Sequence, residues 1–388
     1  MNRASGFRQR PRVLHVITGL DTGGAETSLL RLIATTRETV EHHVCSLTSL
    51  GTLGAAIEAE GATVRALAWR RSIPGPRALS LLLRHVRAVA PDVLHGWMYH
   101  GNLAATLSAA ACAHRPTIVW SVRHALDAWA HESDRLRRTI RLSALVSRSA
   151  DHIVYNSERA AGQHAGIGFA RQHAQVIPNG FALDAFRPDA TARARVRALL
   201  NVRESTPLIG LIARVDPLKD HTTFVAAAAR LAARDAHVCF LLAGRGTDEP
   251  GSPLAQAIAA ANLGDRVRCL GERRDVARLF AALDVATLTS LSEGFPNAIG
   301  EAMACGVPCV ATNVGDAAAL IGDTGALAAP GDAVGIANAW ESVLALSAAQ
   351  RLTMGIAARA RIAQRYSLAA VAAQYVGLYQ PLPLQAAA

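Results

Sequence analysis

The sequence predicts an α/β protein of two domains, each built on a parallel β-sheet with helices on both faces, and three observations lead to that prediction. The chain has 388 residues, more than one hydrophobic core normally organises. Short apolar runs alternate with longer stretches of helical periodicity, the pattern of buried parallel strands joined by crossover helices. This alternation begins again after a segment of turn-forming residues at 178–189.

The turn-forming segment between the two sets of strands places the domain boundary near residue 190. We therefore expect a first domain over 1–190, a second domain over 191–366, and a C-terminal helix with a Pro- and Ala-rich tail over 367–388. The expected strands are 13–18, 43–48, 63–68, 92–95, 117–122, 152–155 and 175–177 in the first half, and 208–213, 237–243, 266–270, 285–289 and 308–311 in the second half.

Composition excludes several classes of protein. With 51% hydrophobic and 18% charged residues, the chain is typical of a well-buried globular protein and not of a disordered one. The apolar run 103–113 is far shorter than the roughly 20 residues that span a bilayer. The basic, polar segment 1–12 does not resemble a signal peptide, so we expect a cytoplasmic location.

Cysteine spacing and acidic motifs give no indication of a metal centre. None of the six cysteines forms a Cys-x-x-Cys pair, so buried thiols are favoured over metal or redox sites. The sequence also contains no Asp-x-Asp and no His-Glu-x-x-His motif. We therefore expect no metal and no resident cofactor.

The formal charge of +10 arises almost entirely from arginine, because Lys219 is the only lysine among 40 basic residues. A GC-rich coding sequence explains such a bias, yet a basic surface still favours an anionic partner: a nucleotide, a lipid headgroup or a nucleic acid. The arginines are spread along the whole chain and no stacking-aromatic motif accompanies them, which disfavours a nucleic acid. In a composition that otherwise avoids lysine, the single Lys219 indicates a position with a specific role.

Three segments follow expected strands and carry the candidate site residues. In the first, Gly23 and Gly24 lie where strand 13–18 turns into a helix, and such a turn lets backbone amides approach an anion. The segment does not have the Gly-x-Gly-x-x-Gly spacing of a dinucleotide site, and a plain tight turn is the alternative.

The second and third segments belong to the second half of the chain. Arg214 and Lys219 follow strand 208–213 across a proline-containing turn, where a planar fork and a compact charge can converge on one diphosphate. After strand 285–289, Glu293 lies before an expected helix that starts near Pro296, and Glu301 lies about one turn inside it. Free amides at this helix start suit phosphate, and the two carboxylates suit sugar hydroxyls.

Together these motifs resemble the retaining family-four (group 1) glycosyltransferases of the GT-B fold, over about residues 12–370. The resemblance implies two Rossmann-like domains that face a cleft, with a C-terminal helix returning to the first domain. The segments that carry it are Gly19–Glu26, Ala213–Asp220, Leu242–Gly246 and Glu293–Pro308, with 92–102, 154–157, 177–180 and 311–316 in support.

The resemblance also implies a role for each site residue. Arg214 and Lys219 would bind the donor diphosphate and stabilise the leaving nucleotide, while Glu293 would contact the transferred sugar and Glu301 would hold the ribose. Further donor-binding positions would be Gly244, the backbone of Phe295, Pro296 and Asn297, and Gly23 and Gly24 from the opposite domain. His124, at the end of strand 117–122, would lie on the catalytic side, or it would be a satisfied polar group.

The implied reaction is transfer of a sugar from a UDP- or GDP-sugar, with retention and without metal, to a lipid-linked glycan or another polysaccharide or lipid acceptor in cell-surface polysaccharide biosynthesis. The segment 135–148 resembles a basic helix that meets anionic lipid at the inner face of the membrane, and a surface helix packed on its own domain is the alternative.

Other interpretations of the same sequence are a non-hydrolysing sugar-nucleotide epimerase of the same fold, a basic nucleotide- or nucleic-acid-binding protein without catalysis, and an inactive scaffold. A pyridoxal-dependent phosphorylase needs a Schiff-base lysine, and the only one, Lys219, is already assigned to the phosphate turn.

Overall fold

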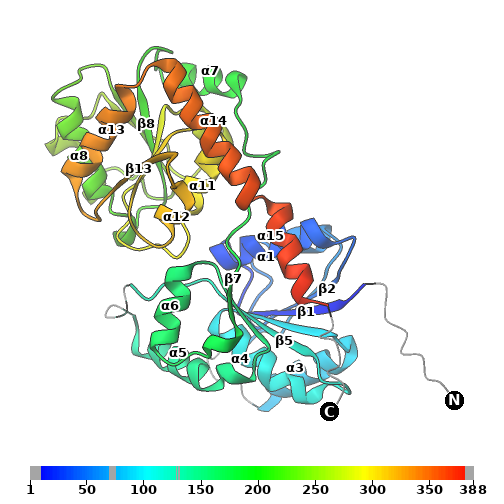
Figure 1. Cartoon of the computed structure of the whole chain (residues 1–388). Helices are drawn as coiled ribbons and strands as arrows, with labels where there is room; N and C mark the ends of the chain where they lie inside the picture. The colour runs from blue at the N-terminus through cyan, green and yellow to red at the C-terminus, as the bar shows by residue number, and fades with distance from the viewer. Residues whose placement is uncertain (1–9, 70–75, 128, 130–131, 381–388) are drawn as a thin grey trace. The chain divides into compact units, whose positions relative to one another are not determined.

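The computed structural model describes residues 10–69, 76–127, 129 and 132–380. The first residues of segment 1–12, on which the expectation about a signal peptide rests, and the end of the tail over 367–388 lie outside the described residues. The chain divides into two compact units (Figure 1). The first unit runs to Gly180 and resumes at Leu368, and the second unit is Phe181–Ser367.

The first unit is built on a seven-stranded sheet in the order β3-β2-β1-β4-β5-β6-β7, and every pair of neighbouring strands is parallel. Strand order reverses between β1 and β4, which is the arrangement of a doubly wound Rossmann-like sheet. The strands are β1 Arg12–Ile17, β2 Glu41–Ser46, β3 Thr63–Ala66, β4 Val93–Trp97, β5 Thr117–Val122, β6 His152–Tyr155 and β7 Ala174–Val176.

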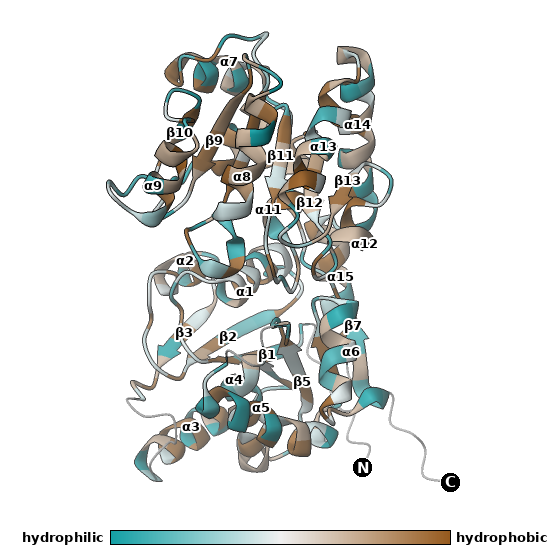
Figure 2. Cartoon of the chain, turned by 90° about the vertical axis from the view of Figure 1, so that its left-hand side faces the viewer, coloured by the Kyte–Doolittle hydropathy of each residue, from teal (hydrophilic) through white to brown (hydrophobic). Residues whose placement is uncertain are grey.

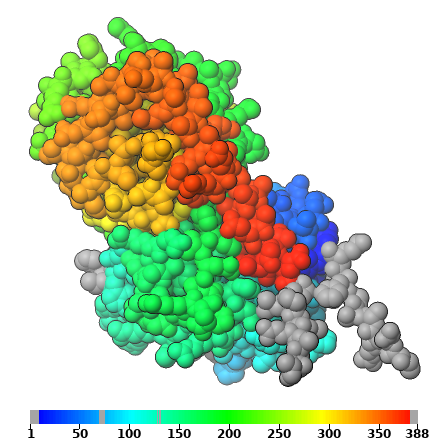
Figure 3. All heavy atoms as spheres, in the orientation of Figure 1, coloured from blue at the N-terminus to red at the C-terminus, as the bar shows by residue number. Residues whose placement is uncertain are grey.

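Helices cover this sheet, and one of them approaches the strands unusually closely. A Cβ at Gly101 would lie 2.3 Å from the carbonyl oxygen of Val16, so glycine lets α4 pack directly on the backbone of β1. The helix α15 lies beside α1, as the red and blue segments in Figure 3 show. The helices are α1 Gly24–Thr36, α2 Gly54–Ala59, α3 Pro76–Val89, α4 Met98–Ser108, α5 Asp134–Val146, α6 Glu158–Gly166 and α15 Leu368–Leu378.

The second unit repeats the architecture with a six-stranded parallel sheet in the order β10-β9-β8-β11-β12-β13. Its strands are largely brown in Figure 2, whereas the surface helix α5 of the first unit carries much teal. The elements are α7 Ala190–Leu199, β8 Leu208–Ile212, α8 His221–Ala232, β9 Cys239–Ala243, α9 Pro253–Ala260, β10 Val267–Cys269, α10 Val276–Ala282, β11 Val285–Leu288, α11 Asn297–Ala304, β12 Cys309–Thr312, α12 Ala317–Ile321, β13 Gly325–Ala328, α13 Ala333–Leu344 and α14 Ala348–Arg365.

Both faces of the second sheet are buried. Along β8, Leu208 belongs to one core cluster, whereas Ile209 and Leu211 belong to the cluster on the other face. A strand buried on both faces has no polar alternation, which is why the sequence of this region is so apolar. The two parallel sheets confirm the expected fold class. The sequence did not indicate β13, because Gly325–Ala328 contains no β-branched residue.

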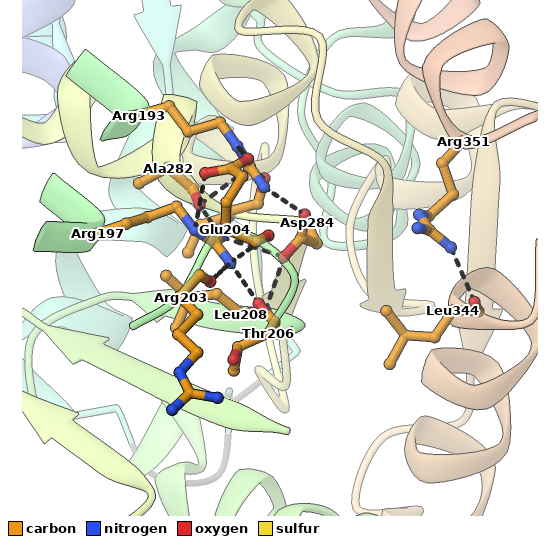
Figure 4. Close-up of polar contacts among 11 residues, drawn as sticks. Arg193, Arg197, Arg203, Glu204, Thr206, Leu208, Ala282, Asp284, Leu344 and Arg351 are labelled. Atoms are coloured by element: carbon orange, nitrogen blue, oxygen red, sulfur yellow. Dashed lines mark hydrogen bonds and ion pairs between the residues drawn. The ribbon is translucent and has the colours of Figure 1, made fainter. Parts of the chain in front are cut away.

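The buried Arg197 connects α7 to this sheet by hydrogen bonds (Figure 4). The Arg197 side chain donates to Asp284 Oδ2 at 3.2 Å and to the carbonyl oxygens of Ala282 and Arg203 at 2.9 and 2.8 Å. Asp284 also accepts from the Leu208 amide at 2.8 Å, at the start of β8. The carboxylate therefore links the helix to the strand and offsets the charge of the buried guanidinium, whose two terminal nitrogens donate to the carboxylate and the carbonyls.

The chain leaves the first unit at Gly180, beside Leu368, where it enters that unit again. A Cβ at Gly180 would lie 2.9 Å from the Cα atom of Leu368, within the first unit. Within the second unit, the Phe181 amide donates to the Tyr366 carbonyl at 2.9 Å. The division falls at residue 180 and not near 190 because Phe181 packs into the core of the second unit, where its ring stacks on Phe295.

Candidate active site

The carboxyl end of β8 forms a turn that holds both predicted cations. Arg214 donates to Asp216 Oδ2 at 2.8 Å, and the other oxygen of Asp216 accepts from the Leu218 amide at 2.9 Å. Partial burial alone would raise the pKa of Asp216, but the hydrogen bonds from the Leu218 amide and the Arg214 guanidinium hold that pKa below its usual range. Arg214 remains 54% exposed, so its charge is available at the surface of the unit.

Lys219 contacts Glu293, a pairing across 74 residues of sequence. Lys219 Nζ lies 2.5 Å from Glu293 Oε1, and Ser290 Oγ donates to the same oxygen at 2.7 Å. The two loops are tied together by their backbones, because the Leu291 amide donates to the Leu218 carbonyl at 2.8 Å. The Glu293 side chain is 12% exposed. The carboxyl ends of the adjacent strands β8 and β11 therefore present a cation and a carboxylate at one point.

Helix α11 follows Glu293 and begins without a side-chain cap, with Pro296 at its N-cap. Within the described residues, the amides of Asn297 and Ile299 donate to the carbonyls of Phe295 and Pro296, so the Ala298 amide is the one at this helix start that suits an anion. Phe295 is only 5% exposed and belongs to the core, so only its backbone can face a ligand. Asn297 opens the helix and Glu301 lies half-buried in its second turn.

Two glycines fix the backbones around this site. A Cβ at Gly244 would lie 2.2 Å from the Ala213 carbonyl oxygen, and a Cβ at Gly315 would lie 2.4 Å from the Glu293 carbonyl oxygen. Both glycines have positive φ, at 142° and 53°, which favours glycine independently of the contacts. In the structure Gly244 thus positions the turn that carries Arg214.

The predicted site residues of the first unit lie at the carboxyl ends of β1 and β5. Gly23 is the N-cap of α1, and a Cβ there would lie 2.4 Å from Glu26 Oε2, whereas a Cβ at Gly24 would meet nothing within 4 Å. His124 contacts two groups: its Nε2 lies 2.9 Å from Glu132 Oε1, and its Nδ1 lies 3.1 Å from the Tyr99 hydroxyl.

The structure thus brings Lys219 and Glu293 into contact, and pairs Arg214 with Asp216 instead of with either of them. Asp216 was not predicted as a site residue from the sequence. It lies within the motif Ala213–Asp220, where an acidic residue between two cations could have indicated an ion pair. Glu132 gave no signal, because it lies in no recognisable motif and contacts His124 only through the fold.

Among the described residues, no group of three or more His, Cys, Asp and Glu side chains is placed to hold a metal ion. The six cysteines are free thiols. The described part of the chain also contains no helix with the length and apolar character needed to cross a bilayer.

Each unit matches a family model. Residues 22–185 match the model described as Glycosyltransferase Family 4, and residues 206–345 match the model described as Glycosyl transferases group 1. The loops with Lys219 and Glu293 fall inside the second match, and His124 falls inside the first. Each half of the chain therefore matches a glycosyltransferase family model.

Two curated relatives match part of the chain. A D-inositol 3-phosphate glycosyltransferase of Mycobacterium marinum is 30% identical over 231 residues, which are 58% of this chain and 49% of that protein. An N-acetyl-alpha-D-glucosaminyl L-malate synthase of Bacillus anthracis is 36% identical over 128 residues, 32% of this chain and 33% of that one. The chain thus spans between a third and half of the length of these relatives.

Solved structures match almost the whole chain in fold. Anabaena Alr3699/HepE in complex with UDP and glucose has a TM-score of 0.82 at 23% identity, covering 95% of this chain and 99% of that one. A glycosyltransferase from Rickettsia africae has a TM-score of 0.81 at 17% identity, covering 96% and 98%. At these identities the likeness shows the Rossmann-like, GT-B type of fold.

Proposed function

We propose that this chain, built of two glycosyltransferase domains, is a retaining glycosyltransferase that moves a sugar from a nucleotide-diphosphate sugar to an acceptor hydroxyl. The observation that carries the proposal is the contact of Lys219 with Glu293 at the carboxyl ends of β8 and β11, beside the exposed Arg214. Open α/β sheets bind their ligands at this edge. A cation pair with an uncapped helix start suits a diphosphate, and a carboxylate suits sugar hydroxyls.

The chemistry assigned to these residues is stabilisation of a leaving group. The bond between the anomeric carbon and the diphosphate oxygen breaks, and negative charge accumulates on the departing nucleotide. Lys219 and Arg214 offset that charge in place, as preorganised cations do. A bond then forms between the anomeric carbon and the acceptor oxygen, whose proton passes to the departing diphosphate. We propose retention of configuration and independence from metal on the basis of the family resemblance.

A UDP-sugar is the first donor to test, with a GDP-sugar second, because the structural neighbour Alr3699/HepE was solved with UDP-glucose as well as with UDP. The assay measures nucleotide release with and without a glycan acceptor. Release that depends on acceptor supports a transferase. Conversion of the nucleotide sugar without any acceptor supports the alternative, a non-hydrolysing epimerase of the same fold.

We further propose that the acceptor is lipid-linked, at the inner face of the cytoplasmic membrane, in surface polysaccharide synthesis. Helix α5 buries Ile140, Ser143 and Ala144 and exposes Leu142 at 51% and Leu145 at 81%. Its outer face also carries exposed arginines, so apolar and basic side chains lie together, as on interfacial helices. The exposed arginines are Arg135, Arg138, Arg141 and Arg148, the last just beyond α5.

Co-sedimentation with vesicles of anionic lipid tests this contact. The double variant Arg138→Gln/Arg141→Gln should lose roughly 30-fold in binding at low salt, at about 1 kcal/mol per arginine. Arg195→Gln, an exposed arginine of the second unit, is the matched control. Unchanged binding of the double variant would exclude α5 as the membrane contact.

A further inference from the structure

A chain of hydrogen bonds runs behind His124 into the first unit. From the interior outward it joins the Ala160 carbonyl, His164, Tyr99, His124 and Glu132. The successive distances are 2.8 Å, 2.8 Å, 3.1 Å and 2.9 Å. The groups come from α6, α4, the end of β5 and the loop before α5. These elements are distant in sequence, so the fold alone creates the chain.

The Ala160 carbonyl, at the inner end of this series of hydrogen bonds, determines which atoms of His164 and Tyr99 donate. His164 is fully buried, and burial lowers its pKa to about 4, which keeps the ring neutral. Because a carbonyl oxygen only accepts, the single ring proton of His164 must be on Nδ1, donated to Ala160. Nε2 of His164 is therefore an acceptor, and Tyr99 must donate its hydroxyl proton to it.

The same reasoning continues outward to His124. Burial raises the pKa of Tyr99, so the phenol keeps its one proton, and that proton is already used on His164. The Tyr99 oxygen can then only accept, which requires a proton on Nδ1 of His124. On the other side of the ring, Nε2 faces the Glu132 carboxylate, which accepts when ionised. Both ring nitrogens of His124 therefore carry a proton.

We propose that Glu132 is a positioning residue of this enzyme, which holds His124 as a doubly protonated ring between itself and Tyr99 at the carboxyl end of β5. The side chains of His124 and Glu132 are 27% and 19% exposed, so the ion pair is largely withdrawn from water yet open to a ligand. The inference rests on the proposed function, and adds to it a fixed cation on the first unit at the carboxyl end of β5, the edge at which open α/β sheets bind their ligands.

The isosteric variant Glu132→Gln tests the proposal without removing a hydrogen bond. A glutamine can turn its amide group toward Nε2 and donate, so that His124 becomes neutral with its proton on Nδ1, still bound by Tyr99. We expect kcat to fall roughly 10- to 100-fold with the KM for the donor little changed. Glu132→Asp keeps the carboxylate and should restore part of the rate. Asp134→Asn, at an exposed carboxylate that pairs with Arg137, should leave kcat unchanged.

The protonation state is measured separately, in long-range ¹H–¹⁵N spectra of protein labelled with ¹⁵N-histidine, with His124→Gln for assignment. The wild-type ring should show two protonated nitrogens, and Glu132→Gln should lose the proton from Nε2. A bare Nε2 in the wild-type chain, or identical spectra and kcat in Glu132→Gln, would overturn the proposal. If the wild-type chain transfers no sugar, the proposed function fails, while the spectra still decide how His124 is protonated.

Discussion

The two units bury polar side chains by different chemistry. Of the 14 histidines in the chain, only His221 and His237 belong to the second unit. The described first unit buries His15, His42, His85, His95 and His164. The buried polar network of the second unit is formed instead by Arg197 with Asp284. An arginine keeps its charge at every accessible pH, whereas a histidine does not.

The histidines of the first unit form a network that requires neutral rings. The Trp97 indole donates to His15 Nδ1 at 3.1 Å, so the proton of His15 is on Nε2, which lies 2.9 Å from His42 Nδ1. His42 Nε2 in turn lies 2.8 Å from the Thr36 hydroxyl, which donates to the Leu32 carbonyl. An extra proton on either ring would put two donors face to face. The difference between the units thus predicts different responses to acid.

Acidification should produce the largest effect, and it should act on the first unit. Burial lowers the pKa of His42 to about 3 and that of His85 and His164 to about 4, and it lowers the pKa of His15 and His95 further below 6.5. As the pH falls below 6.5, the unfolded chain binds protons that the native chain excludes, so stability is lost. At pH 5 the loss is about 2 kcal/mol for a ring whose native pKa is 4 or lower, such as that of His42 or His164.

Hydrogen exchange measured by mass spectrometry at pH 7.5 and pH 5, corrected for the intrinsic exchange rates, compares the two units directly. Peptides from β1 and β4 should lose protection before peptides from β8 and β11. Equal loss in both units, or earlier loss in the second, would contradict the assignment of acid sensitivity to the buried histidines.

Removal of the buried guanidinium should destabilise the second unit at every pH. Arg197→Ala removes one donor to Asp284 and the donor to the Arg203 carbonyl, whereas Arg193 still donates to Asp284. The loss should therefore lie near the lower end of the about 3–5 kcal/mol that breaking a buried pair costs. The measurement is urea unfolding at pH 7.5 and pH 6, with the exposed Arg195→Ala as the control. A change below about 1 kcal/mol would show that the network does not support this unit.

Lys219→Ala should lower kcat/KM by roughly 100-fold or more, the effect of losing a preorganised donor to the leaving group. The folded structure should tolerate the change, because Ser290 still donates to Glu293. Steady-state kinetics measure kcat/KM for Lys219→Ala, for Arg214→Ala and for the control Arg195→Ala. Near-wild-type turnover in both Lys219→Ala and Arg214→Ala would show that these residues do not bind the donor diphosphate.

A smaller effect should come from Gly24→Ala, which tests whether ligand approaches the first unit at α1. The added Cβ meets no protein atom within 4 Å, so the thermal midpoint should not fall. If the ligand lies here, kcat/KM should drop about 10-fold through misplacement. Gly162→Ala, another helical glycine of the first unit with open space around it, is the matched control. Wild-type kinetics in Gly24→Ala would place the ligand elsewhere.

The strands were predicted more accurately from sequence than the polar contacts were. β5 and β6 have the expected bounds, because their runs of β-branched and aromatic residues are bounded by turn-forming or helical sequence. The loops after β8 and β11, which were expected to form the site, contact each other through the ion pair of Lys219 with Glu293. The spacing of these residues in the sequence could not reveal this contact. The buried His15 and His95 have hydrogen-bond partners that lie far away in sequence, His42 and Tyr379, so the network that they form was not predictable.

A thermal-shift titration with UDP, GDP, ADP and dTDP tests whether the second unit binds a nucleoside diphosphate through Lys219. A ligand at about 100 times its Kd should stabilise the fold by roughly 2.7 kcal/mol. We expect a shift with one nucleotide that Lys219→Ala abolishes. No shift with any of them, or a shift that persists in Lys219→Ala, would contradict it.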